Sequence, residues 1–356
     1  MTTWESYPSD YRSQAVQAIL EAVRAGECAA VVGLSGSGKS NLLGFLAQRM
    51  NDLPRTPRLV LVDCNRLTDF SGQAFFNLVR RELGCTCEGA DEVAAVEMAI
   101  SRCLEGMPGL CLLLDRFDVL GERGEAALFS NLRALRDAHK YSLTYVVATR
   151  RPLDPRSELA ELFFANTLWL GPLSESDARW NVARYARRKG LAWSEEAVQA
   201  ILRISGGYPA FLRAVCEAHA AGEPLALPGI SAHPAVSRRV AEFWADQPGE
   251  ADLRQSGLAG NPLLQTGRTA LSLDTSQLTA KEHLLWEYLL AHPGEVCEKD
   301  ALVRAVWPED RIFAQGIRDD SLAQLVRRLR EKVEPDPSNP RHIHTVAGRG
   351  YRLLTD

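Results

Sequence analysis

The fold of the first half of this chain is decided by eight residues, Gly33-Leu34-Ser35-Gly36-Ser37-Gly38-Lys39-Ser40. They match the pattern GxxxxGK[ST] at every fixed position. The small and β-branched run before them, 28–32, suits a buried strand, and apolar residues recur at helical spacing over 41–50. A strand, a glycine-rich loop and a helix in this order form the context in which the pattern binds nucleotide phosphates.

Each residue type in this loop has a chemical task. The glycines let the backbone turn tightly and direct several amides at one point, and the helix that opens at Lys39 adds the positive end of its dipole. Lys39 is expected to reach the terminal phosphates, and the Ser40 hydroxyl is expected to ligate Mg²⁺. The predicted loop set is Gly33, Ser35, Gly36, Ser37, Gly38, Lys39, Ser40 and Asn41.

Charged residues follow two further predicted strands. Residues 110–115 form a continuous apolar run that ends in Asp115, and such runs indicate burial on both faces, as in a parallel sheet. Asp115 is therefore predicted to orient Mg²⁺, and Asp118 is a candidate for polarising the attacking water. Arg150 follows the strand predicted over 142–149, where it could sense the terminal phosphate from the side opposite Lys39. The alternative is that Arg150 and its neighbour are solvated loop arginines.

Only helices are predicted after this α/β part. Ser174 caps a helix that runs through Arg188, and Ser194 caps another that runs through Ile204. A third helix follows Gly206-Gly207-Tyr208-Pro209. Pro224, Pro228 and Pro234 break the following region, and residues 246–250 break it again. Residues 226–262 are therefore expected to be a small helical connector or a mere spacer, to which we assign no function, and 263–265 and 270–273 look extended.

The phosphate loop, the strand ending in Asp115, the strand-end Thr-Arg and the helices around Gly207-Tyr208-Pro209 together resemble the STAND signalling ATPases, a branch of the AAA-like P-loop class. The resemblance covers residues 10 to 225. It implies ATP or ADP with Mg²⁺ as cofactor, contact of Pro209 with the adenine base, and closed and open states set by the nucleotide. No glutamate directly follows Asp115, which favours a slow ATPase that serves as a switch over a motor.

The C-terminal residues predict a winged helix-turn-helix. A helix opens at Thr279 with Glu282 three residues later as a capping box, and further helices are expected over 298–307 and 319–334. Two short strands then flank a Gly-Arg-Gly turn at 348–350. Three helices and a hairpin of this kind make up a winged helix.

The segments LTAKEHLLWEYLLAHPGEV and DDSLAQLVRRLREKVEPDPSNPRHIHTVAGRGYRL resemble the OmpR/PhoB-type transcriptional effector domain over residues 278–354. The resemblance implies that the third helix enters the major groove of DNA and that the wing touches the minor groove. By position, the implied DNA-binding residues are Ser321, Gln324, Arg327, Arg328, Arg330, Thr345 and Arg349. Between 327 and 352 there are seven basic residues against three acidic ones, although the chain as a whole has a net charge of -4.

Composition limits the alternatives. A chain of 356 residues suggests two or three domains, and 46% hydrophobic with 24% charged residues is ordinary for a soluble globular protein. Because no long apolar run or basic-then-apolar N-terminus is present, we expect a cytoplasmic bacterial protein without a membrane partner. The eight cysteines are scattered, so they are expected to be reduced thiols.

The expected fold class is an α/β P-loop NTPase, a parallel sheet flanked by helices, with a helical lid, followed by the winged helix. The expected boundaries are 1–170 for the NTPase core, 171–225 for the lid, 226–262 for the connector and 263–356 for the winged helix. The hypothesis is a transcriptional regulator in which ATP or ADP switches the binding of double-stranded DNA or self-association. One alternative is an ATPase that acts on DNA itself, of the initiator, mobile-element or anti-phage defence type. Another is a sensor whose winged helix recruits protein.

Overall fold

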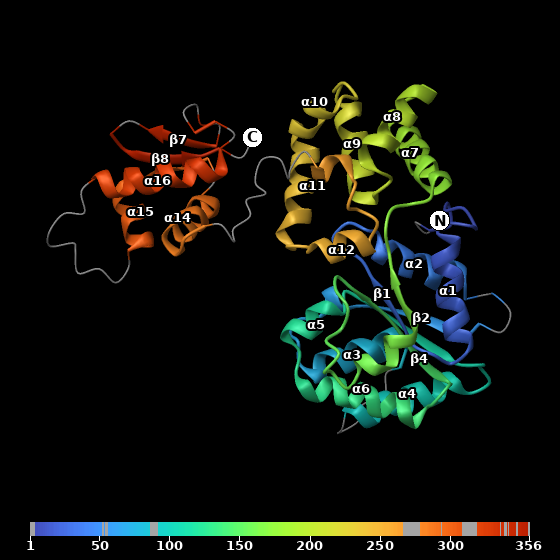
Figure 1. Ribbon diagram of the computed structural model, residues 1–356. Coiled ribbons are helices and arrows are strands. Elements are labelled where there is room, and N and C mark those ends of the chain that lie inside the picture. The colour runs from blue at the N-terminus through green and yellow to red at the C-terminus, as the bar shows by residue number, and fades with distance from the viewer. Residues whose placement is uncertain are drawn as a thin grey trace. The chain divides into compact units, whose positions relative to one another are not determined.

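The computed structural model describes residues 4–51, 53, 56–85, 92–265, 278–292, 294–307, 319–334, 336, 337, 340, 342–346 and 348–354 (Figure 1). The chain divides into two compact units, Met1–Leu263 and Leu264–Asp356. Among the described residues, no helix combines the length and the hydrophobicity needed to cross a membrane. Each unit has a hydrophobic core of its own.

A parallel sheet forms the centre of the N-terminal unit (Figure 1). Its strands are β1 (Ala29–Val32), β2 (Arg58–Asp63), β3 (Leu110–Asp115), β4 (Leu143–Thr149) and β5 (Thr167–Trp169). The order is β2-β3-β4-β1-β5, and every neighbouring pair is parallel. One strand, β4, therefore lies between the strand that leads into the phosphate loop and the strand that ends in Asp115. Because β1, β3 and β4 are parallel, their carboxyl ends lie at the same edge of the sheet.

Helices cover both faces of this sheet. They are α1 (Ser13–Arg24), α2 (Lys39–Arg49), α3 (Gly72–Glu82), α4 (Glu92–Leu104), α5 (Asp118–Arg123) and α6 (Ala126–Ala138), with short 3₁₀ turns at Cys64–Arg66 and Ala160–Asn166. Leu112 and Tyr145 pack with α3, α4 and α6 on one face. Leu113 and Val146, which point to the other face, are also fully buried. The predicted fold class is confirmed.

Helices follow the sheet, as the caps predict. They are α7 (Glu175–Lys189), α8 (Glu195–Ser205), α9 (Pro209–Ala220), α10 (Leu227–Ala232), α11 (Pro234–Ala245) and α12 (Glu250–Gln255). The Ser174 and Ser194 side chains accept hydrogen bonds from the first turns of α7 and α8, as expected of N-caps. The connector is joined to the lid, because Phe243 of α11 packs against Tyr208 and Phe211, with ring centroids 5.9 and 5.5 Å apart.

One strand prediction is wrong. Residues 263–265 are helical rather than extended. The Asn261 side chain accepts a hydrogen bond from the Leu263 amide at 3.1 Å, and Pro262 occupies the first helical position. Asparagine as N-cap followed by proline is a strong helix start, and it overrides the apolar run that suggested a strand. The other segment predicted to be extended, 270–273, lies outside the described residues.

The C-terminal unit contains α14 (Ala280–Ala291), β6 (Val296–Glu298), α15 (Lys299–Val306), α16 (Asp319–Val333), β7 (Ile343–Val346) and β8 (Gly350–Leu353). The strands form an antiparallel sheet in the order β6-β8-β7. Trp286, Leu302, Leu329 and Ile343 fill its core. The sequence did not predict β6, a three-residue strand that is held by its pairing with β8. The three helices and the hairpin of the predicted winged helix are present.

The capping box at Thr279 also ties α14 to α16. The Thr279 amide donates to Glu282 at 2.8 Å, and Lys332 of α16 donates to the same carboxylate at 2.6 Å. The two bonds to the carboxylate lower the pKa of Glu282 against the opposing effect of its burial. Glu282, predicted as part of the capping box that starts α14, thus also joins α14 to α16.

Candidate nucleotide-binding and DNA-binding sites

The phosphate loop connects the end of β1 to the start of α2. The Gly33 amide donates to the Thr149 carbonyl of β4 at 3.0 Å, which continues the sheet into the loop. A side chain at Gly33 would place its Cβ 2.6 Å from the hydroxyl of the fully buried Ser37. Gly33 is therefore required for close packing of the loop on itself. Asn41 lies exposed in the first turn of α2.

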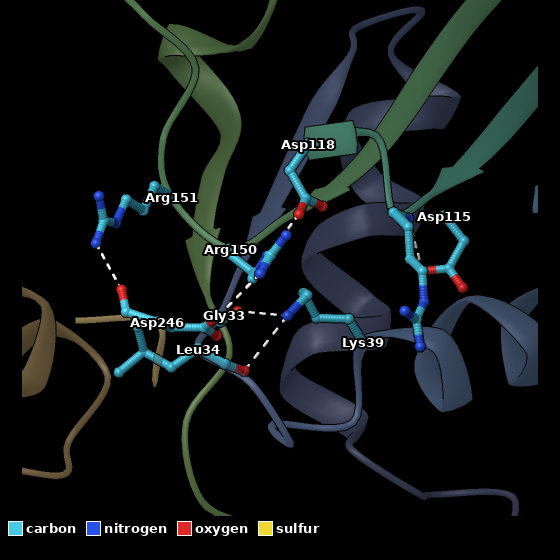
Figure 2. A network of polar contacts seen from close by, with 9 residues as sticks. Gly33, Leu34, Lys39, Asp115, Asp118, Arg150, Arg151 and Asp246 are labelled. Atoms are coloured by element: carbon cyan, nitrogen blue, oxygen red, sulfur yellow. Dashed lines mark hydrogen bonds and ion pairs between the residues drawn. The ribbon is translucent and has the colours of Figure 1, made fainter. Parts of the chain in front are cut away.

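Lys39 is held by the loop's own carbonyl groups. Its ammonium donates to the carbonyl oxygen of Gly33 and, at 3.4 Å, to that of Leu34 (Figure 2). Burial lowers the pKa of Lys39 to about 8, although the nearby Asp118 and Asp115 act in the opposite direction. A phosphate in the loop would replace carbonyl dipoles with a full negative charge, so Lys39 is placed to exchange one set of partners for the other.

The two residues predicted to serve Mg²⁺ meet in the structure. Burial raises the pKa of the Asp115 carboxyl group, and the nearby Ser40 hydroxyl acts in the opposite direction. Asp115 also accepts a hydrogen bond at 3.0 Å from the amide of Arg116. A hydroxyl and a carboxylate beside a phosphate loop are hard oxygen donors of the kind Mg²⁺ prefers, since the ion usually takes one or two carboxylates together with substrate phosphates. These residues fit the expected ion.

Arg150 joins two carboxylates at the edge of the site. Its Nε atom lies 2.6 Å from Asp118, and its Nη1 atom lies 2.9 Å from Asp246, the residue that follows α11 (Figure 2). Arg151 donates to the carbonyl oxygens of Asp246 and Gln247 at 2.7 and 3.0 Å. Both arginines therefore contact the connector, while Arg151 is exposed and the side chain of Arg150 is 40% exposed, and the phosphate-sensing role of Arg150 stays a prediction.

The helical lid sits directly on the phosphate loop. The Tyr208 hydroxyl donates to the Ser35 carbonyl at 2.7 Å, and the Ala210 amide donates to the Gly36 carbonyl at 3.2 Å. A Cβ built on Gly38 would contact the Pro209 ring at 3.6 Å. Pro209 thus lies against the loop, and its contact with the adenine base stays a prediction.

One face of α16 is exposed to solvent, and the opposite face packs in the core of the C-terminal unit. Ser321, Gln324, Arg327 and Arg328 are exposed, while Leu322, Leu325, Val326 and Leu329 are buried. Arg327 makes a helix-surface contact of 3.3 Å with Glu331. The predicted face therefore presents two guanidinium groups to solvent.

Arg330 has a different environment. Its guanidinium donates to the Ile343 carbonyl at 3.0 and 2.6 Å and to the Thr345 hydroxyl at 2.9 Å, and so ties α16 to β7. Thr345 is exposed on β7, and Arg349 is exposed in the turn between β7 and β8. The DNA contacts of these three residues stay predictions, and Arg330 has in addition a role within the domain.

Comparison with known proteins agrees with both halves of the chain. Residues 11–231, more than half of the chain, match the family described as Novel STAND NTPase 1. The chain belongs to this STAND NTPase family. Residues 274–353 match the family described as "Transcriptional regulatory protein, C terminal". The STAND and winged-helix resemblances inferred from the sequence are thereby confirmed.

Curated relatives match the C-terminal part. RegX3 of Mycobacterium tuberculosis, a sensory transduction protein, is 41% identical over 80 residues, which are 22% of this chain and 34% of RegX3. YcbL of Bacillus subtilis, an uncharacterised transcriptional regulatory protein, is 31% identical over 128 residues, which are 33% of this chain and 50% of YcbL. The chain thus spans half or less of the length of these relatives.

Solved structures with 13% identity align along most of the chain. The Walker-type ATPase PABY2304 of Pyrococcus abyssi aligns with 96% of this chain and 92% of its own, with a TM-score of 0.47. The ORC2 protein of Aeropyrum pernix aligns with 96% and 88%, with a TM-score of 0.48.

Two residues of this STAND NTPase site were missed in the sequence. Arg12 is buried and donates to the carbonyl oxygens of Ser37 and Gly171 at 2.8 and 3.1 Å, and its amide donates to Asp177 at 3.0 Å. It thereby fastens the phosphate loop to the start of the lid. No local sequence pattern distinguishes Arg12. The second residue is Asp246, which lies in a segment that the sequence predicts only as a helix break.

Proposed function

We propose that this STAND NTPase is a DNA-binding transcriptional regulator of the bacterial cytoplasm, whose bound nucleotide, ATP or ADP, sets its affinity for DNA or its self-association. The observation that carries the proposal is the lid seated on a complete phosphate loop, in a chain that also contains a winged helix with an exposed basic helix face. A nucleotide can shift such a protein only if it binds one of two arrangements more tightly. The contacts of the lid with the loop are the contacts a nucleotide would alter.

The residues of the loop explain how nucleotide is held. Loop amides and the N-terminus of α2 receive phosphate oxygens, and Lys39 turns from the carbonyl oxygens of Gly33 and Leu34 to the phosphates. Ser40 and Asp115 would hold Mg²⁺, which neutralises phosphate charge when bound. Pro209, packed on the loop by α9, would meet the base.

Hydrolysis is proposed to be slow. Arg116 occupies the position after Asp115, so no carboxylate is supplied there to activate water. Asp118 is the remaining candidate, and its carboxylate accepts a 2.6 Å bond from Arg150. The ion pair with Arg150 occupies one oxygen of this carboxylate, which leaves Asp118 less available to orient a water molecule. Slow turnover suits a switch, since the nucleotide state then persists.

DNA would be bound through α16 and the wing. Gln324, Arg327 and Arg328 lie on the exposed face of a helix of 15 residues, long enough to lie in the major groove. Each phosphate neutralised by arginine or lysine makes binding more sensitive to salt. One such domain makes few contacts, so strong binding would require two copies on adjacent or inverted half-sites.

The test is binding of the full chain to DNA from upstream of its own gene, with ATP, ADP or no nucleotide, at about 50 and 200 mM salt. We expect site-specific affinity that changes at least fivefold with nucleotide. Lys39→Ala should abolish that response, whereas Lys189→Ala, an exposed lysine at the end of α7, should retain it. Affinity indifferent to nucleotide, together with hydrolysis stimulated by DNA, would refute the switch and favour an ATPase that acts on DNA.

A further inference from the structure

Asp246 is an acidic residue held against the phosphate-binding end of the site. It follows the last residue of α11, and its side chain is 19% exposed. One carboxylate oxygen accepts the 2.9 Å bond from Arg150, and the other is buried with no hydrogen-bond partner among the described residues. A buried carboxylate oxygen without a partner is unfavourable, so this position depends on the cation it meets.

The negative charge of Asp246 acts on Lys39 of the phosphate loop. The charged groups that influence the Lys39 ammonium are Asp118, Asp115, Arg150 and Asp246, which are three carboxylates and one cation. Figure 2 shows the head groups of Lys39, Arg150 and Asp246 gathered at the loop. A phosphate that arrives there therefore meets a negative side chain as well as two positive ones.

The backbone around Asp246 is fixed to the core. Arg151 binds the carbonyl oxygens of Asp246 and Gln247, and Gln247 adopts a left-handed backbone angle, φ 47°. Three residues before Asp246, the ring of Phe243 packs edge-on against Tyr208, whose hydroxyl binds the loop carbonyl of Ser35. The end of α11 is thus linked to the phosphate loop through Tyr208 and to the end of β4 through Arg150 and Arg151.

We propose that Asp246 is a specificity-determining residue that favours ADP over ATP. Its carboxylate occupies the Nη1 atom of Arg150, the part of the guanidinium that Asp118 does not bind through Nε, and a third phosphate beside Arg150 would be repelled by the negative charge of Asp246. ATP must displace Asp246 from Arg150, whereas ADP leaves the contact in place. The inference rests on the proposed function in one respect, that nucleotide binds this phosphate loop.

The experiment compares Mg²⁺-ATP and Mg²⁺-ADP affinities of the full chain by calorimetry. Asp246→Asn retains the size of the side chain and removes its charge, and we expect it to raise ATP affinity about tenfold relative to ADP. Glu242→Gln, at an exposed position of α11 paired with Arg239, is the matched control and should leave the ratio unchanged. Asp246→Ala should act in the same direction, which keeps the test valid if the asparagine variant does not fold.

An unchanged ATP-to-ADP ratio in folded Asp246 variants would overturn the role of Asp246 and leave the proposed function standing. Equal gains for both nucleotides would also overturn it, because the third phosphate would then not be what Asp246 opposes. Failure of the unaltered protein to bind either nucleotide would instead refute the proposed function. The two failures are therefore separable in one set of titrations.

Discussion

Replacement of Gly36 by alanine tests whether the lid rests on the phosphate loop. Gly36 has a left-handed backbone angle, φ 82°, and a Cβ built there would lie closer than 3.0 Å to the Cβ of Ala210. The ordinary separation of such carbons is about 3.5–4.0 Å. Because the Ala210 Cβ is fixed to the backbone of α9, it cannot rotate away, and either the loop or the helix must move.

The expected loss of stability has two parts. A residue with a side chain in the left-handed region costs about 1–2 kcal/mol, and overpacking a close contact costs about 1–3 kcal/mol. Gly84→Ala isolates the first part, since Gly84 has a similar φ of 76° and nothing within 4 Å of its built Cβ. Gly36→Ala should therefore lose about 1–3 kcal/mol more than Gly84→Ala. Effects on the unfolded chain cancel between two glycine-to-alanine changes.

The measurement is urea unfolding followed by circular dichroism, with the transition of the N-terminal unit identified as the one that ADP shifts to higher urea. We also expect Gly36→Ala, and not Gly84→Ala, to weaken ADP binding, because separation of loop and lid disturbs the site. Equal losses of stability in the two variants would refute the reasoning. They would mean that Ala210 does not lie against Gly36.

Four further predictions concern single side chains. ADP affinity should fall as pH rises above about 8, because burial lowers the pKa of Lys39 to about 8 and phosphate prefers its charged form; titrations of Lys39→Met across this range should show no such slope. Asp115→Asn should weaken Mg²⁺ binding to the nucleotide complex by about 10–100-fold and leave Mg²⁺-free ADP binding nearly unchanged, as metal titrations would show. Arg327→Ala should lower DNA affinity and reduce the salt slope by about one with little change in stability, and an unaltered slope would contradict its phosphate contact. Arg330→Ala should destabilise the winged helix by about 1–2 kcal/mol in thermal unfolding, since three hydrogen bonds to β7 are lost.

The sequence by itself determined the local parts of this protein. The pattern over 33–40 fixed the strand, loop and helix of the phosphate site, and serine caps fixed the starts of α7 and α8. These signals are short because they arise from backbone hydrogen bonds and periodic burial within a few residues of one another. The helical start of residues 263–265 is also local, because the Asn261 cap and Pro262 favour a helix over the strand that the apolar run suggests.

The tertiary structure decided which distant residues meet. The ion pair of Arg150 with Asp246 joins positions 96 residues apart, and Arg12 reaches Gly171 across 159 residues. Neither contact leaves a pattern in the sequence, because it depends on how helices pack over the sheet. Arg330 shows the same limit within one helix: its spacing beside Arg327 and Arg328 suggests a common outward face, and only the position of β7 turns its guanidinium to the Ile343 carbonyl. Local interactions therefore determine the helices and strands, whereas the packing of these elements determines which distant side chains interact.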